Sequence, residues 1–141
     1  MRTHYNSEVT AEMDGQRVRL AGWAHETRVF GKINFVILRD RSGLMQVIFK
    51  EGEASGELLQ KAKSLVKETS IVVDGVVRSS KIANLGREIV PENMEVVGRV
   101  HGMVPFELTG KVPADLDVRL DNRFVDLRRI EVQAVFKIRA E

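Results

Sequence analysis

Short runs of alternating hydrophobic and polar residues fill most of the first hundred positions. Residues 17–27 begin with Arg-Val-Arg-Leu, the two-residue period of a strand with one buried face. Gly22 falls within this run and predicts a bulge or a bend, because glycine in a strand often marks such a point. The segment 17–27 is therefore predicted to be a first strand.

Two nearly continuous apolar runs follow, at residues 33–39 and 44–49. A turn at residues 30–32 precedes the first run, and the sequence Asp-Arg-Ser-Gly at residues 40–43 separates the two. Aspartate, serine and glycine favour tight turns. The pattern predicts an antiparallel hairpin.

One helix and two more strands are expected next. Residues 58–66 carry apolar side chains at helical spacing, which indicates a short amphipathic helix that plugs one end of a barrel. Residues 70–78 form a fourth strand. Residues 88–90 and 94–100 form a fifth strand region, which Pro91 interrupts.

The order of three strands, one helix and two strands is typical of an OB fold, a five-stranded Greek-key barrel. The fold class is therefore predicted to be mainly β with one short helix. Another small β-barrel or an α+β sandwich is the alternative that this order leaves open.

The pattern changes after residue 100. Residues 101–120 contain two prolines and few periodic apolar positions, which indicates an extended connector. Residues 121–129 are densely charged, with acidic and basic side chains interleaved as in a salt-bridged surface. Residues 130–141 begin a helical pattern without a stop signal. We therefore expect the N-terminal piece of a longer protein.

Composition restricts the classes of function. With 141 residues, 43% of them hydrophobic, the chain can bury one core. It contains no cysteine, which excludes disulfides and thiolate metal sites. It has neither a run of about 20 apolar residues, as a membrane span needs, nor a secretory signal. A cytoplasmic protein with no membrane partner is expected. A net charge of +2 favours nucleic acid only weakly.

The predicted hairpin carries the candidate site. If Arg39 pairs with Leu44, then Phe35 and Gln46 are diagonal neighbours on one face, with Cα atoms about 7–8 Å apart. An unpartnered buried amide costs about 1–3 kcal/mol, so the face of Gln46 is expected to meet solvent. A phenyl ring can stack on an unpaired base while an amide bonds its edge.

Simpler explanations exist for each of these residues. Phe35 could be a core residue, and Gln46 an ordinary solvated one. Glu88, before the fifth strand, could accept a hydrogen bond from a cytosine amino group or be a solvated edge residue. Basic residues near the hairpin could contact phosphates or be ordinary surface charges: Arg28, Lys32, Arg39, Arg41 and Lys50.

Other chemistry is not indicated. The three histidines lack the spacing of metal ligands, and the sequence shows neither a catalytic triad nor a glycine-rich phosphate loop. No metal site or cofactor is predicted within these residues.

Three segments together resemble the N-terminal region of aspartyl-tRNA synthetases of the archaeal type: GWAHETR, FVILRDRSGLMQVIF and RLDNRFVDLRR. The opening RTHYNSEV fits the same type, and the resemblance covers essentially the whole chain. It implies an anticodon-binding OB domain at residues 1–103, a hinge at 104–129 and the start of a class II catalytic-domain helix at 130–141.

The resemblance implies that the parent protein is an aspartate–tRNA ligase, a homodimer that activates aspartate with ATP and Mg²⁺. The catalytic residues of that family would lie beyond Glu141, so the 141-residue chain is expected to be inactive in catalysis. The parent would charge tRNA-Asp, whose anticodon is GUC, and in relaxed members of the family also tRNA-Asn, whose anticodon is GUU.

Matching motifs transfer roles to individual residues. Phe35 would stack on the middle anticodon base, a uridine, and Gln46 would bond its edge. Arg28 would contact the loop near the first base, and Glu88 would sit near the outer bases. His25 and Asn84 can each donate or accept a hydrogen bond, so either could adapt to cytosine or uracil at the third base; alternatively, neither reaches it.

Two other interpretations of function are compatible with the sequence. The chain could be a free-standing OB module that binds single-stranded RNA or DNA. It could instead be a structural domain of a larger assembly, which would bind neither an anticodon hairpin nor random single strands.

Overall fold

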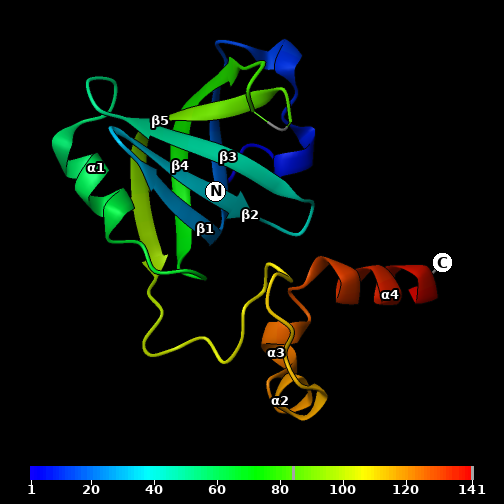
Figure 1. The fold of residues 1–141 in the computed structure, drawn as a ribbon. Coiled ribbons are helices and arrows are strands. Elements are labelled where there is room, and N and C mark those ends of the chain that lie inside the picture. Colours follow the sequence, from blue (N-terminus) through cyan, green and yellow to red (C-terminus); the bar gives the residue numbers. More distant parts are fainter. Residues whose placement is uncertain (84, 141) are drawn as a thin grey trace. The chain divides into compact units, whose positions relative to one another are not determined.

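The first 101 residues form a closed five-stranded β-barrel in the computed structural model, which describes residues 1–83 and 85–140 (Figure 1). The strands follow the order β1-β2-β3-β5-β4 around the barrel. Their bounds are β1 Arg17–Phe30, β2 Ile33–Arg39, β3 Leu44–Lys50, β4 Ser70–Ser79 and β5 Arg87–Gly98. Two 3₁₀ turns precede them, at Asn6–Glu8 and Ala11–Met13. This order confirms the predicted Greek-key OB barrel.

The register of the β2–β3 hairpin is the predicted one. Arg39 pairs with Leu44, Ile37 with Gln46 and Phe35 with Ile48. Burial alternates along β2, so that Val36 and its inward neighbours are buried while Phe35 and Ile37 are only half-buried. Gln46 shares this outward, half-buried face, as the cost of burying its amide had suggested.

Helix α1, Gly56–Lys63, closes one end of the barrel as predicted. The Ser55 hydroxyl caps it by accepting a hydrogen bond from the Leu58 backbone N–H at 3.2 Å. Leu58 and Ala62 pack into the barrel core, as does Leu65 beyond the end of the helix. The largest fully buried side chains of that core come from the strands: Phe49, Leu20, Leu38, Met45, Ile71 and Ile89.

Gly22 does not mark a bulge, one of the two features predicted for it. The β1–β4 pairing runs through Gly22 without a shift, and the bulge in β1 lies between Ala24 and Glu26. A Cβ atom at Gly22 would collide with the backbone carbonyl of Arg39. Glycine is therefore required because two strands approach closely here, and the predicted bulge at this residue was wrong.

Pro91 does not interrupt β5, contrary to the prediction. The register shifts between the pairs Asp74–Asn93 and Gly75–Pro91, which leaves Glu92 as the extra residue of a bulge. A bulge is one of the places where a strand tolerates proline, which has no N–H to donate. β5 therefore continues past Pro91 along the same partner strand.

Residues 102–140 form a second compact unit. Residues 102–115 follow an irregular path, as the predicted connector would, but two short helices come next, α2 Leu116–Asp121 and α3 Arg123–Asp126. The Arg119 guanidinium donates to the Asp126 carboxylate at 2.9 Å, so the charged segment folds back on itself rather than extending. The predicted last helix is present as α4, Ile130–Ala140.

Candidate nucleic-acid interface

One row of side chains crosses the outer face of the barrel. Glu26 of β1 pairs with Ile37 of β2, and Ile37 pairs with Gln46 of β3. Gln46 reaches Glu88 of β5, and Glu88 pairs with Arg78 of β4. Residues that oppose one another on neighbouring strands share a face. The row therefore spans all five strands. Its members are polar except for Ile37.

Gln46 and Glu88, two of the predicted site residues, are in direct contact. The Gln46 Nε2 donates to Glu88 Oε2 at 3.0 Å, and the Arg78 Nε donates to Glu88 Oε1 at 3.0 Å. The Glu88 side chain is only 7% exposed. Because a carboxylate accepts and cannot donate, Glu88 fixes the orientation of the Gln46 amide.

Arg78 connects the network to the loop after β3, because its Nη1 donates to Glu53 Oε2 at 3.1 Å. Burial by itself would lower the pKa of the Arg78 guanidinium, but the hydrogen bonds and charges of Glu88 and Glu53 outweigh it and raise that pKa. A hydrogen bond from Lys50 lowers the pKa of the Glu53 carboxyl. Both shifts favour the charged forms of Arg78 and Glu53.

Phe35 lies next to this network on the same face. It pairs with Ile48 on one side and with Arg28 on the other. Its ring is half-buried, which leaves surface for a planar ligand. The Arg28 side chain is 61% exposed and bonds Glu26 at 2.9 Å. Phe35 and Gln46 thus share one face, as the sequence predicted, and Arg28 of β1 and Glu88 of β5 lie beside them.

His25 is the extra residue of the β1 bulge and is nearly buried. The Arg39 Nη1 lies 2.7 Å from His25 Nδ1. Arginine can only donate, so Nδ1 must accept and the ring proton lies on Nε2. The predicted ability of His25 to donate or accept toward a base is therefore reduced to donation alone.

Arg39 does not belong to the basic surface that the sequence suggested. Its side chain is 4% exposed and makes a bidentate ion pair with Glu68, with Nη2 2.7 Å from Oε2. The other predicted cations lie at the surface: Arg28, Lys32, Arg41 and Lys50. Lys50 donates to Glu53 at 2.8 Å, and Arg41 stacks over the Tyr5 ring at 5.1 Å from its centroid. Asn84 lies outside the described residues.

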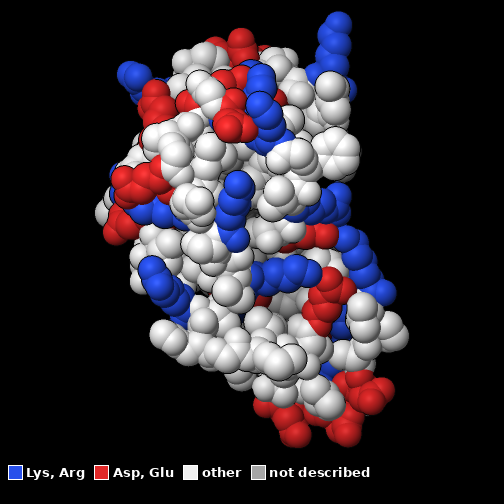
Figure 2. Space-filling view, turned by 60° about the vertical axis from the view of Figure 1, so that its left-hand side comes forward, with Lys and Arg blue, Asp and Glu red and all other residues white. Residues whose placement is uncertain are grey.

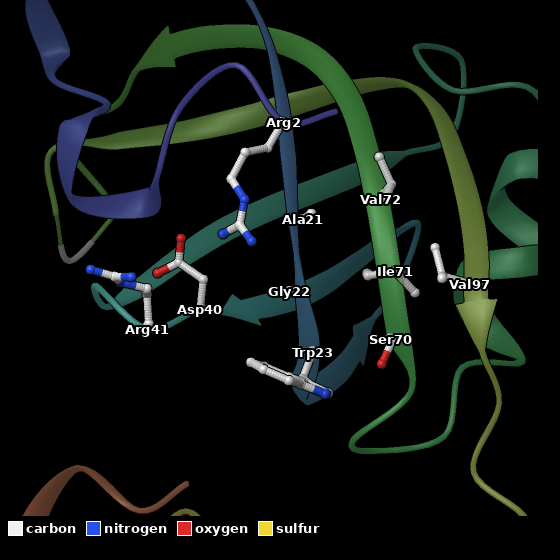
Figure 3. Close-up of a pocket in the computed structure, with 10 residues that line it drawn as sticks. All are labelled: Arg2, Ala21, Gly22, Trp23, Asp40, Arg41, Ser70, Ile71, Val72 and Val97. Carbon is white, nitrogen blue, oxygen red and sulfur yellow. The ribbon is translucent and has the colours of Figure 1, made fainter. Parts of the chain in front are cut away.

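A separate cavity of about 300 Å³ opens elsewhere on the barrel (Figure 3). Its polar rim consists of Arg2, Asp40 and Arg41, and Trp23 stands at one end of it. Apolar side chains of β4 and β5 line the other side: Ile71, Val72 and Val97. Arg41, one of the candidate phosphate contacts, lines this cavity, whereas Phe35, Gln46, Glu88, Arg28 and His25 do not.

Charge alone does not mark the interface. On the face that Figure 2 shows, basic and acidic side chains are intermingled. This agrees with the near balance of 22 basic and 20 acidic residues. This face therefore carries no broad positive field.

Two residues beside this network were not singled out from the sequence. Arg78 contacts the far side of Glu88, and the alternation of the fourth strand could have placed it on the outer face. Phe30 ends β1 and is 79% exposed. The sequence predicted a turn at Phe30, whereas the strand continues to this residue and gives its side chain a definite face.

These features define a small five-stranded β-barrel with an aromatic residue and a polar network on one outer face. Residues 18–97 match the tRNA anticodon family model, described as an OB-fold nucleic acid binding domain. The chain belongs to this family of anticodon-binding OB-fold domains.

Proteins similar to this chain include aminoacyl-tRNA ligases. The aspartate–tRNA(Asp) ligase of Pyrococcus horikoshii is 46% identical over 99% of this chain and 32% of its own length. The aspartate–tRNA(Asp/Asn) ligase of Methanocaldococcus jannaschii is 47% identical with the same coverage. The crystal structure of asparaginyl-tRNA synthetase from Pyrococcus horikoshii has a TM-score of 0.86 at 32% identity and covers 96% of this chain and 31% of its own.

The chain therefore spans about a third of the length of these relatives. Among residues 1–83 and 85–140, no helix is both long and apolar enough to cross a membrane. In the same residues, His, Asp and Glu side chains do not gather in threes around a point where a metal ion could bind.

Proposed function

We propose that this chain is the anticodon-reading part of an aspartate–tRNA ligase. The observation that carries the proposal is the Gln46 amide, which Glu88 orients at 3.0 Å beside the half-exposed ring of Phe35. A base can stack on Phe35 while its edge meets Gln46, since the two residues are diagonal neighbours on one face.

The orientation of the amide suits a uracil. One N–H of the Gln46 amide donates a hydrogen bond to Glu88. The second N–H and the Oε1 atom can therefore bond a ligand. Uracil presents an N3–H donor beside a carbonyl acceptor, which complements this pair. Cytosine presents an acceptor at N3 beside an amino donor and would need the amide reversed. The middle base of GUC is a uracil.

Glu88 acts through Gln46 in this proposal. Each of its oxygens already accepts a hydrogen bond from the protein, and its side chain is nearly buried. We therefore assign it a positioning role in place of the predicted direct contact with an outer base. Arg28, exposed beside Phe35, is placed to contact a phosphate or the first base of the loop.

The parent enzyme would activate aspartate with ATP and Mg²⁺, as a cytoplasmic homodimer, and charge tRNA. We assign the ATP- and Mg²⁺-dependent steps to the two thirds of the relatives' length that this chain does not match. The chain by itself is expected to bind tRNA without catalysing its aminoacylation.

A free-standing module for single-stranded nucleic acid is the second candidate function, and the OB barrel itself favours it. Equilibrium binding of the 141-residue chain separates the two. An anticodon reader binds a stem–loop RNA carrying GUC more tightly than an unstructured RNA of the same composition. A general module binds both equally, and a purely structural domain binds neither.

Replacing Glu88 by glutamine tests the orientation of the amide. The new side chain can donate as well as accept, so Gln46 is no longer held in one orientation. We expect the preference for a GUC over a GCC stem–loop to fall at least about fivefold, the lower end of the discrimination that a good contact to a base edge provides. Fluorescence anisotropy with the two RNAs measures this ratio.

The matched control is Glu92→Gln, which changes an exposed carboxylate on the same strand and should leave the ratio unchanged. Circular dichroism establishes that both variants are folded. A ratio that stays constant in Glu88→Gln but falls in Gln46→Ala would remove the positioning role from Glu88.

Discrimination at the third base is expected to be weak. His25 can only donate through Nε2, so it offers no acceptor for the amino group that distinguishes cytosine from uracil. We expect GUC and GUU stem–loops to bind within about tenfold, or ~1.4 kcal/mol. A preference for GUC of about a hundredfold or more, ~2.7 kcal/mol, would instead assign the chain to a strict enzyme.

A further inference from the structure

Phe30 lies on the same face as the proposed site. It is the last residue of β1 and pairs with Ile33 at the start of β2. Ile33 and Phe35 are two residues apart on one strand and therefore share a face, as do Phe30 and Arg28. Phe30 and Phe35 are diagonal neighbours, with Cα atoms about 7–8 Å apart.

The ring of Phe30 is largely free of the protein. It is 79% exposed, whereas the neighbouring Val29, on the opposite face, lines a cavity of about 190 Å³ with Leu59 and Gln60 of α1. An exposed phenyl ring contributes little to the barrel core. Its exposed position beside Phe35 and Arg28 makes the ring accessible to a ligand that reaches Phe35.

Arg28 is a neighbour of both aromatic residues. It is directly opposite Phe35 on β2 and two residues before Phe30 on β1. A cation beside two aromatic rings suits single-stranded nucleic acid, in which bases stack on the rings and a phosphate meets the cation. Gln46 on β3, Phe35 on β2 and Phe30 at the end of β1 lie along one diagonal of the sheet.

We propose that Phe30 is a second stacking surface, which takes the nucleotide next to the one on Phe35. The inference rests on the proposed function and extends it from one base to two. The occupant is the neighbouring base on the side of the β1–β2 turn at residues 31–32, away from Gln46 and Glu88. Arg28 holds the phosphate between the two bases. Stacking needs no hydrogen bond to the base edge, so this contact adds affinity without selecting a particular base.

The test is binding of the 141-residue chain to the GUC stem–loop. Phe30→Ala should weaken binding about five- to 30-fold, within the range of one base–aromatic stack. Phe30→Leu should weaken it nearly as much, because leucine is apolar but has no ring, while Phe30→Trp should retain it. Val29→Ala is the matched control, an exposed neighbour on the opposite face, and should leave the affinity unchanged.

Abasic RNAs identify the occupant. An abasic site at one of the two nucleotides that flank the middle base should abolish the effect of Phe30→Ala, while the effect of Phe35→Ala persists. The inference is wrong if Phe30→Ala or Phe30→Leu binds as tightly as the unaltered chain. It is also wrong if Phe30→Ala weakens binding of both abasic RNAs as much as it weakens binding of the intact RNA. If Phe35→Ala weakens binding and Phe30→Ala does not, only the role of Phe30 is overturned. Absence of binding by the unaltered chain would overturn the proposed function as well.

Discussion

Replacing Phe35 by alanine is expected to lower the affinity of the 141-residue chain for a GUC stem–loop RNA about five- to 150-fold. The phenyl ring lies half-exposed on the outer face of the barrel, beside the amide of Gln46. Stacking of one base on an aromatic ring is worth about 1–3 kcal/mol by alanine substitution. Titration calorimetry or fluorescence anisotropy gives the change directly.

Ile33→Ala is a suitable control for this experiment. Ile33 is also half-buried and lies two residues away on the same face of β2, but it has no ring. Truncation of Ile33 should cost much less binding than truncation of Phe35, and thermal melts of both variants establish that the barrel is intact. Unchanged affinity in a folded Phe35→Ala protein would show that the assigned face is not the binding site.

Replacing Glu68 by alanine is expected to destabilise the barrel by about 3–5 kcal/mol. Glu68 and Arg39 form a bidentate pair in which both side chains are almost fully buried, with distances of 2.9 and 2.7 Å. Removal of the carboxylate leaves a buried guanidinium without its counter-charge, which is costly. Since small domains unfold with only about 5–15 kcal/mol, urea denaturation should show a large shift of the midpoint.

Two comparisons separate this effect from ordinary loss of a surface charge. Glu92→Ala breaks the exposed pair with Arg17 and should cost less than about 1 kcal/mol. The double variant Arg39→Met with Glu68→Leu should recover most of the loss, because apolar side chains can replace a buried ion pair. A cost below about 1 kcal/mol for Glu68→Ala would show that the guanidinium finds solvent or another partner.

The Arg39–Glu68 pair also supports the proposed interface. The Glu68 backbone N–H donates to the Ala24 carbonyl at 2.8 Å, and the Ala24 N–H donates to the Thr69 carbonyl at 2.9 Å. These bonds join the loop before β4 to the β1 bulge at His25. The bulge shifts the register of β1, so that Glu26 and Arg28 oppose Ile37 and Phe35.

Local sequence patterns were sufficient for the strands, the helix and the hairpin register. The turn at residues 40–43 fixes which residues of β2 and β3 oppose one another, and the two-residue period then fixes their faces. Phe35 and Gln46 could be placed together for this reason. The glycine and proline positions were less informative, because Gly22 and Pro91 mark a close approach and a bulge that depend on other strands.

The sequence by itself determined the order of the elements, the barrel class and the placement of Phe35 and Gln46 on one face, because these depend on periodicity and on turns between near neighbours in the chain. Only the tertiary structure decided that Arg39 is buried against Glu68, that Glu88 orients Gln46, and that Phe30 is exposed on the same face. Glu88 lies 42 residues from Gln46, and Glu68 lies 29 residues from Arg39. Contacts at such separations arise from closure of the barrel, which brings β3 beside β5 and the loop before β4 beside β1.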